Sequence, residues 1–168
     1  MLDSLSNIFK ITELRNKILY TLMMFAVFRA GIHIPVPGVD ASVIESLFTS
    51  GNLFGLLDLF AGGALSKFSI FAMSITPYIN ASIIMQLLQS VVPQFEAWSK
   101  DGEDGRKKIA KVTRYGTVVL GFVQAAGMAF ALRANNALVN NDFLSVFVVA
   151  IILTAGTCLL MWIGEQIT

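Results

Sequence analysis

Residues 53–92 read LFGLLDLFAGGALSKFSIFAMSITPYINASIIMQLLQSVV and form a long, mostly apolar stretch. A single helix of this length would extend for about 60 Å, roughly twice the hydrocarbon thickness of a bilayer. Gly62 and Gly63 interrupt the first half, and Pro77 lies near the middle. We therefore expect a short half-helix that re-enters the membrane, a break in the helix, and then a full crossing over residues 75–92.

The composition of the whole chain indicates a lipid environment. Of its 168 residues, 55% are hydrophobic and 14% are charged, and the mean hydropathy is +0.71. A soluble domain of this size could not keep so much apolar surface away from water. The formal net charge of +1 gives no indication of a nucleic-acid partner.

Three further apolar runs are long enough to cross a bilayer, and they cover residues 18–34, 115–132 and 143–164. Together with residues 75–92 they predict four crossings. The segments between them are expected outside the hydrocarbon: an amphipathic surface helix at 1–17, external segments at 35–56 and 133–142, a solvated basic loop at 93–114, and the end of the chain at 165–168. The predicted fold is an all-α membrane protein, a transmembrane helix bundle with a broken, re-entrant second helix.

The distribution of basic residues predicts the orientation of these crossings. Nine of the twelve Lys and Arg residues precede the first crossing or lie between Lys100 and Arg114, and the positive-inside rule assigns this side to the cytoplasm. The other three, Arg29, Lys67 and Arg133, then lie at or near the opposite side. Both the amino terminus and residues 165–168 are therefore expected in the cytoplasm.

The sequence offers little to support catalysis. No expected crossing contains paired carboxylates, a histidine cluster or an HExxH-type motif. The single Cys158 and the single His33 cannot form a metal cluster, and His33 and Arg29 are expected at the membrane interface. We therefore predict no enzymatic activity, no metal site and no cofactor.

Several residues inside the expected crossings leave two interpretations open. Three uncharged amides belong to this group: Gln86, Gln89 and Gln124. They serve either as hydrogen-bonding contacts between helices or as part of a gate. Ile75 and Ile79, one helical turn apart, would by default pack in a core, but their position at a helix break suggests that they line a cavity.

A small-residue stripe on the third crossing predicts close helix packing. Gly121, Ala125 and Ala129 follow one another at intervals of four residues, so they share one face of the helix. This pattern indicates that a second helix approaches closely, without indicating a specific function.

Three stretches carry a resemblance to a known family: HIPVPGVD at 33–40, LFAGGALSKFSIFAMSITPYINASIIMQLL at 59–88, and DGEDGRKKIAKVTRYGT at 101–117. In these motifs the chain resembles the SecY family of protein-conducting channels, and the resemblance extends over essentially all 168 residues. Family members have ten transmembrane helices in two halves. The resemblance implies that this chain supplies the first four, and thus a partial channel.

The resemblance assigns roles to residues around the break. It places a plug-like half-helix and the break at 57–74, with the plug formed by Leu57, Asp58, Leu59, Phe60, Ala61, Gly62, Gly63, Ala64, Leu65, Ser66 and Lys67. It matches the apolar pore ring to Ile75 and Ile79, whose branched side chains would form a dewetting constriction. It also places Gln86 and Gln124 at or near a lateral gate through which signal sequences enter the lipid.

The resemblance also implies partners. SecE, SecG and the SecA motor or the ribosome are expected to bind, with cytosolic contacts at Arg106, Lys107, Lys108, Lys111 and Arg114. The other binding partners are the translocating polypeptide with its signal sequence and the membrane lipid, with no direct contact to nucleic acid. The implied function is translocation of unfolded polypeptides and release of membrane proteins into the bilayer of the cell membrane.

Two other functions are compatible with parts of the pattern. Broken helices also build the substrate sites of secondary transporters, although such a site predicts a polar residue at the break rather than Ile75 and Ile79. A membrane scaffold without a conduit would need only the stripe of small residues on the third crossing.

Overall fold

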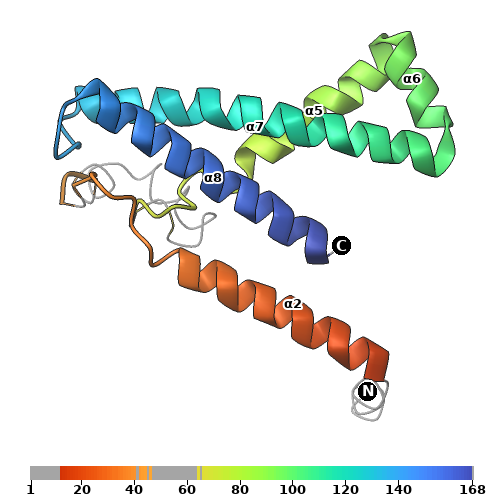
Figure 1. Cartoon of the computed structure of the whole chain (residues 1–168), viewed down its shortest axis with the longest axis horizontal. Coiled ribbons are helices and arrows are strands. Elements are labelled where there is room, and N and C mark those ends of the chain that lie inside the picture. The colour runs from red at the N-terminus through yellow and green to blue at the C-terminus, as the bar shows by residue number, and fades with distance from the viewer. Residues whose placement is uncertain (1–11, 41, 45, 47–63, 65, 168) are drawn as a thin grey trace.

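A computed structural model of the chain describes residues 12–40, 42–44, 46, 64 and 66–167 (Figure 1). Within these ranges the longer elements are five helices: α2 (Thr12–Gly31), α5 (Thr76–Val91), α6 (Pro93–Lys100), α7 (Gly102–Ala134) and α8 (Phe143–Ile167). The same ranges contain no strand beyond two isolated antiparallel bridges, Pro35 with Ser69 and Val39 with Leu138. The described part of the chain is therefore all-α.

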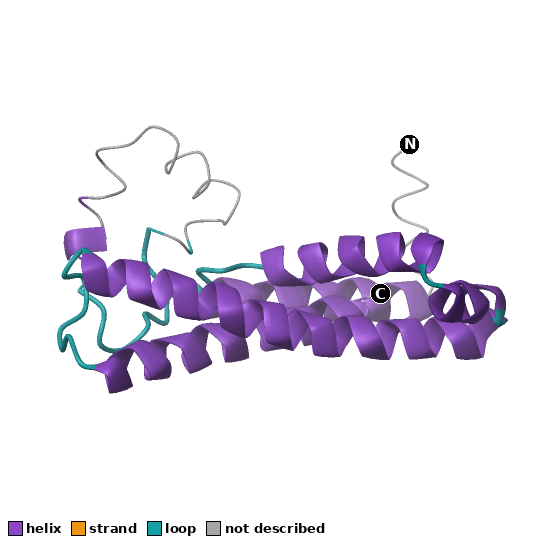
Figure 2. Cartoon of the chain, turned by 90° about the horizontal axis from the view of Figure 1, so that it is seen from above, coloured by secondary structure: helices purple, strands orange, loops and turns teal. Residues whose placement is uncertain are grey.

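Helices α2, α5, α7 and α8 run roughly along one direction and share two ends, whereas the short α6 lies across them (Figures 1 and 2). One end contains α6 and the carboxyl end of α8. We call it the hairpin end, because the chain turns back there from α5 through α6 into α7. The opposite end, where α2 stops and residues 135–142 join α7 to α8, is the loop end. Helix α7 packs against α5, α6 and α8, whereas α2 packs against α8 alone among the described helices.

Two of the described helices, α7 and α8, are long and apolar enough to span a membrane by length and composition. Helix α7 has 33 residues and is therefore about 50 Å long, more than the hydrocarbon thickness alone requires. Helix α5 is shorter, with 16 residues, and α2 has 20 residues but includes the charged Glu13, Arg15, Lys17 and Arg29. Length and composition thus identify α7 and α8 as the third and fourth expected crossings. The same criteria do not identify α2 and α5 as crossings.

The polar residues 93–114 differ from the expected solvated loop, because they form helix α6 and the first turns of α7. Val92 is extended, as the residue before a proline prefers, and Pro93 occupies the first turn of α6, where its missing N–H costs nothing. Gly102, with a φ of 68°, reverses the chain between the two helices. The expected hairpin is therefore helical, and it extends α7 beyond its apolar part.

The amino-terminal boundary also differs from the sequence prediction. Residues 12–17, expected to belong to a separate surface helix, are continuous with the first apolar run in α2. The helix then ends at Gly31 instead of Ile34, and residues 32–40 form turns that run across the loop end. Residues 1–11 lie outside the described part of the chain.

Helices α7 and α8 meet along the stripe of small residues, as expected. Gly121 is buried and Ala125 and Ala129 are fully buried, and the stripe continues in Thr113 and Thr117 at the same interval of four. A Cβ atom built on Gly121 would lie 3.7 Å from Pro77 Cβ and 3.9 Å from Thr154 Cγ2. The stripe is therefore where α5 and α8 both approach α7.

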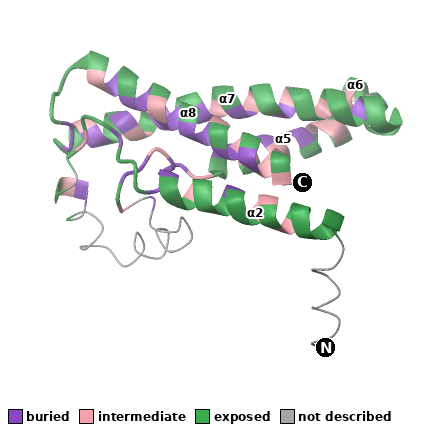
Figure 3. Ribbon diagram, turned by 60° about the horizontal axis from the view of Figure 1, so that its bottom comes forward, coloured by how far each residue is buried: buried purple, intermediate pink, exposed green. Residues whose placement is uncertain are grey.

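The largest cluster of buried apolar residues lies at the loop end. Figure 3 colours the buried residues along the ribbon. The main cluster combines the second half of α7, the first half of α8, the turns of residues 36–40 and 68–73, and Ile44. Backbone hydrogen bonds join the first of these turns to the connection between α7 and α8, from Asp40 N to Ala137 O at 2.8 Å and from Val139 N to Gly38 O at 3.0 Å. The loop end is therefore a packed cap rather than a set of free loops.

Ala129→Leu should destabilise the protein, because the added atoms have no space in the α7–α8 interface. Overpacking of this kind costs about 1–3 kcal/mol. Ala131→Leu is the matched control, since Ala131 lies two residues away on the same helix and is exposed. Thermal unfolding of the detergent-solubilised protein should show a lower midpoint for Ala129→Leu only, and equal midpoints for the two variants would contradict this packing.

Candidate functional site

The candidate site lies where α5 begins, next to a segment of irregular backbone. Residues 66–75 form a series of turns, and two of them, Phe68 and Ser74, have positive φ angles of 41° and 53°. Such angles are costly for residues other than glycine and persist only where the surroundings impose them. Ile75 is the N-cap of α5, and its carbonyl accepts hydrogen bonds from Tyr78 N at 3.0 Å and Ile79 N at 3.1 Å.

Ile75 and Ile79 do not pack into the described core. The side of α5 that carries Pro77 and Ala81 is buried against α7, while Ile75 and Ile79 remain 37% and 47% exposed. The default interpretation, core packing, therefore does not hold among the described residues. Both isoleucines therefore remain partly accessible at the point where the irregular backbone becomes helical.

This exposed apolar face continues along α5 towards the hairpin end. Ile83 and Leu87 follow Ile79 at intervals of four residues and are 50% and 63% exposed. An interval of four advances by 400°, so consecutive members are offset by about 40° and the strip winds slowly around the helix. Helix α5 thus presents a continuous aliphatic surface that none of the described helices covers.

Most of the predicted plug lies outside the described residues, which include only Ala64, Ser66 and Lys67 of it. Ala64 is fully buried and belongs to a small cluster with Ile32, Phe71 and Leu160. Its carbonyl accepts a hydrogen bond of 3.0 Å from Ser69 N. Lys67 is exposed, and Ser66 is half-buried.

A second feature is a cleft of about 340 Å³ at the hairpin end. Helices α5, α6, α7 and α8 all contribute to its lining, which includes Gln86, Gln89, Arg106, Thr113 and Glu165. The lining is mixed, with amides, hydroxyls and two opposite charges beside apolar side chains. The predicted residues Gln86 and Arg106 therefore share one cleft.

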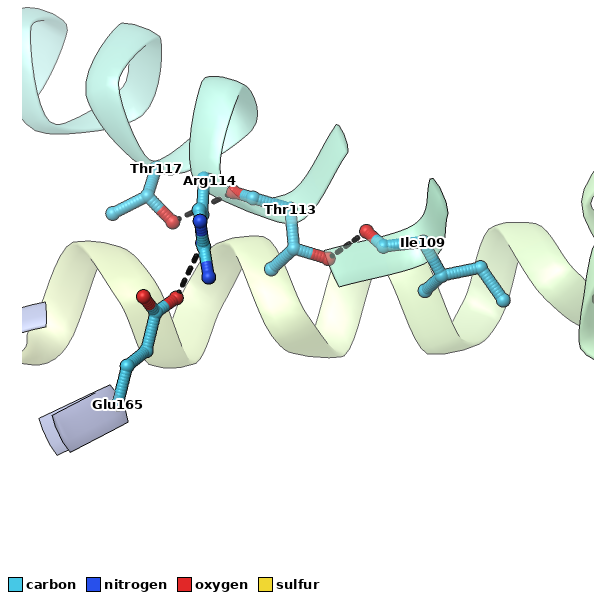
Figure 4. Close-up of polar contacts among 5 residues, drawn as sticks. All are labelled: Ile109, Thr113, Arg114, Thr117 and Glu165. Carbon is cyan, nitrogen blue, oxygen red and sulfur yellow. Dashed lines mark hydrogen bonds and ion pairs between the residues drawn. The ribbon is translucent and has the colours of Figure 1, made fainter. Parts of the chain in front are cut away.

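An ion pair joins α7 to α8 at the edge of this cleft (Figure 4). Arg114 Nε lies 2.6 Å from Glu165 Oε1, and Glu165 is the less exposed partner, at 25% against 53%. On the neighbouring turns of α7, Thr113 donates to Ile109 O at 2.9 Å and Thr117 donates to Thr113 O at 2.8 Å. Thr113 and Thr117 thus satisfy their own hydroxyls within the helix, and the charged pair adds a polar link between α7 and α8 at this end of their packed interface.

The other predicted cytosolic contacts are exposed on the first turns of α7. Lys107, Lys108 and Lys111 all face solvent, and Lys107 Nζ lies 3.8 Å from Asp104 Oδ1. On α6, a hydrogen bond and the charge of Lys100 lower the pKa of Glu96 below its ordinary value. Because the pKa of Glu96 is lower in the folded protein than in the unfolded chain, its interaction with Lys100 stabilises the fold above the ordinary pKa of the carboxyl group. This stabilisation is lost as the pH falls through the pKa of Glu96 in the folded protein.

The similarity of the chain to known proteins is consistent along its length. A family model for SecY matches residues 69–168. The chain belongs to the SecY family. It is 54% identical to the protein translocase subunit SecY of Halalkalibacterium halodurans, 52% identical to that of Bacillus subtilis and 48% identical to that of Staphylococcus aureus, in each case over the whole chain. The chain spans about 40% of the length of these relatives.

Within this SecY-family chain, the two glutamines assigned to a gate lie far apart. Pro77 of α5 lies next to Gly121 of α7, and Gln86 lines the same cleft as Thr113. Gln124 follows Thr113 by eleven residues on α7, or about 17 Å along the helix. The structure therefore does not bring Gln86 and Gln124 together, although Gln124 is half-buried.

In this SecY-family chain, the ion pair between Arg114 and Glu165 is a feature that was not predicted from the sequence. A signal was present, because the two opposite charges lie at the same predicted membrane surface, beside consecutive crossings. Nothing in the sequence indicated the cleft, because residues 93–100, which form α6 at its edge, were expected to belong to a loop.

Glu165→Gln should weaken the link between α7 and α8, since it removes the charge that Arg114 faces. A partly exposed pair of this kind contributes up to about 1 kcal/mol and is screened by salt. We expect a small decrease in the thermal midpoint at low salt that shrinks at high salt. The charge-swapped variant Arg114→Glu/Glu165→Arg should recover part of the loss, whereas Lys111→Gln, at an exposed lysine of the same helix, should have no effect. A salt-independent decrease would contradict the ionic link.

Proposed function

We propose that this chain forms the first four crossings of a Sec protein-conducting channel in the cell membrane. Such a channel would pass unfolded secretory polypeptides across the bilayer and release membrane proteins into it. Membership of the SecY family supports this proposal, as do relatives named as protein translocase subunits. The observation that carries it is the exposure of Ile75 and Ile79 at a helix start flanked by irregular backbone.

The two isoleucines would work as part of a ring that repels water. Irregular backbone at membrane depth is tolerated only within protein or beside an aqueous cavity, and the proposed topology would place the irregular residues 66–75 at this depth. A constriction of branched apolar side chains dewets, so it resists ions when no polypeptide is present. Such a ring binds no particular sequence strongly, which suits a conduit for many substrates.

The topology follows from the same proposal. In it, α2 and α5 cross the membrane together with α7 and α8, and the hairpin end faces the cytoplasm. Eight of the basic residues of the described part support this orientation, because Arg15, Lys17 and the six from Lys100 to Arg114 all belong to segments at the hairpin end. The positive-inside rule assigns such an end to the cytoplasm.

The remaining assignments are proposals on the same basis. Residues 57–67 would form the plug, and α5 and α7 with Gln86 and Gln124 would contribute to a lateral gate. The exposed cations at the hairpin end would contact the SecA motor or the ribosome: Arg106, Lys107, Lys108, Lys111 and Arg114. SecE and SecG would complete the membrane complex. The energy for transport would come from such partners, and this chain would not itself be an enzyme.

Ile79→Gly, alone and combined with Ile75→Gly, should raise the resting ion conductance of the full-length channel several-fold. The substitution removes the apolar side chains that keep the constriction dry. Ile84→Gly is the matched control, because Ile84 is 45% exposed on the same helix and lies about 140° around it from Ile79. The conductance of planar bilayers that contain the reconstituted channel measures the effect.

Equal conductance for the Ile79→Gly and Ile84→Gly channels would contradict the ring. Solute uptake by the reconstituted protein would instead favour a secondary transporter. A protein that supports neither conductance nor transport would favour a membrane scaffold.

A further inference from the structure

The residues immediately before α5 are held more tightly than their irregular backbone suggests. We call residues 69–73 the connector, since they join the turns at the loop end to the start of α5. Ser69 is fully buried, Phe71 is 1% exposed and Ala72 is 4% exposed. Inside the connector, Ser69 Oγ accepts a hydrogen bond of 3.2 Å from Phe71 N.

Backbone hydrogen bonds fix the connector to the turns that follow α2. Ile70 N donates to Ile34 O at 3.1 Å, and Val36 N donates to Phe68 O at 3.0 Å. On the two sides of the connector, Phe68 and Ser74 adopt their positive φ angles. The chain therefore turns sharply at Phe68 and at Ser74, and the connector between these two residues is held in place by hydrogen bonds and burial.

Two glycines on different helices give the connector its space. A Cβ atom built on Gly156 of α8 would lie 1.9 Å from the carbonyl oxygen of Ile70, a backbone atom that no rotamer change can remove. A Cβ atom on Gly31 of α2 would lie 2.1 Å from Cε2 of the Phe71 ring. The Phe71 ring also stacks on Phe28 of α2, with ring centroids 5.6 Å apart.

We propose that Gly31 and Gly156 are positioning residues for the pore ring. They allow α2 and α8 to close on the connector, and the connector then fixes where α5 begins. Only Ser74 separates the connector from Ile75, the N-cap of α5, and Ile79 follows one turn later. The effect of the two glycines on the pore ring rests on the function proposed above, whereas their effect on the position of α5 does not.

A side chain at Gly156 would have to displace this arrangement. Real Cβ atoms do not approach other heavy atoms closer than about 3.0 Å, so Gly156→Ala requires Ile70 or α8 to move by at least about 1 Å. Gly127→Ala is the matched control, because a Cβ atom on this helical glycine of α7 meets nothing within 4 Å. Both variants replace a helical glycine by alanine, so both gain the same helix propensity.

A disulfide can report the position of α5 independently of channel activity. Pro77 Cβ lies 3.7 Å from a Cβ atom built on Gly121, within the range of about 3.5–4.5 Å that disulfides require. The experiment introduces Pro77→Cys and Gly121→Cys into the full-length channel, with Cys158→Ser and the replacement of any cysteine outside residues 1–168. Oxidation of the pair in membranes and the resting ion conductance are then measured with Gly156→Ala and with Gly127→Ala.

We expect Gly156→Ala to decrease the oxidation yield several-fold and to increase the resting conductance, and Gly127→Ala to change neither. An unchanged oxidation yield in Gly156→Ala would overturn the proposal, as would a parent pair that does not oxidise. Decreased oxidation without any effect on conductance would support the placement of α5 and contradict the proposed channel function. The two ideas can therefore fail separately.

A rescue experiment covers the case in which Gly156→Ala does not fold. The three atoms nearest to a Cβ atom on Gly31 all belong to the Phe71 ring, and Phe71→Leu removes this ring. Gly31→Ala alone should decrease the oxidation yield, and Gly31→Ala/Phe71→Leu should restore most of it. If the double variant is no better than Gly31→Ala alone, the contact with Phe71 does not position α5.

Discussion

The arrangement of this chain depends on one packing constraint, the burial of residues 69–73 between α2 and α8. A carbonyl oxygen rests against Gly156 and an aromatic ring rests against Gly31, so these helices approach the segment as closely as its backbone permits. Interiors are close-packed, and a position fixed by backbone contact is not adjustable by side-chain movement. Because residues 69–73 lie directly before Ser74 and Ile75, their fixed position also fixes where α5 begins, and thereby where Ile75 and Ile79 lie.

Three buried threonines satisfy their hydroxyls within their own helices, whereas the buried hydroxyl of Thr157 has no hydrogen-bond partner among the described residues. Thr113, Thr117 and Thr154 lie in the helix interfaces, and each donates its hydroxyl to the carbonyl four residues earlier. A buried hydroxyl without a partner would cost free energy, and this local bond avoids that cost without a second helix. Charged residues lie instead towards the two ends, where Arg114 and Glu165 link α7 to α8 outside the apolar part.

The sequence predicts this fold well where a physical pattern is long and strong. The apolar runs at 115–132 and 143–164 lie within α7 and α8, and the interval of four in Gly121, Ala125 and Ala129 identified the face on which α7 packs. The hairpin at 93–114 was predicted as a loop because its charges dominate its composition. Proline at the first turn of α6 and the pair of Glu96 with Lys100 favour a helix there nonetheless.

The site was predictable in part, for an equally physical reason. The residues at the break, Ile75 and Ile79, follow from the proline and from the length of the apolar stretch. Contacts between distant segments, such as that of Ile70 with Gly156, leave no pattern in a single sequence. Gly31 and Gly156, each taken alone, are ordinary residues of a membrane helix. Most of the predicted re-entrant half-helix lies on residues outside the described part of the chain, and the half-helix stays a prediction.

The most direct measurement of the central claim is crosslinking from position 79 to a polypeptide in transit. A secretory chain stalled within the full-length channel should form an adduct with Cys at position 79, in the Cys158→Ser background, because the account places this side chain at the constriction. Cys at position 84, on another face of α5, should react much less. No adduct at position 79, or equal adducts at both positions, would contradict the claim that the start of α5 lines a conduit.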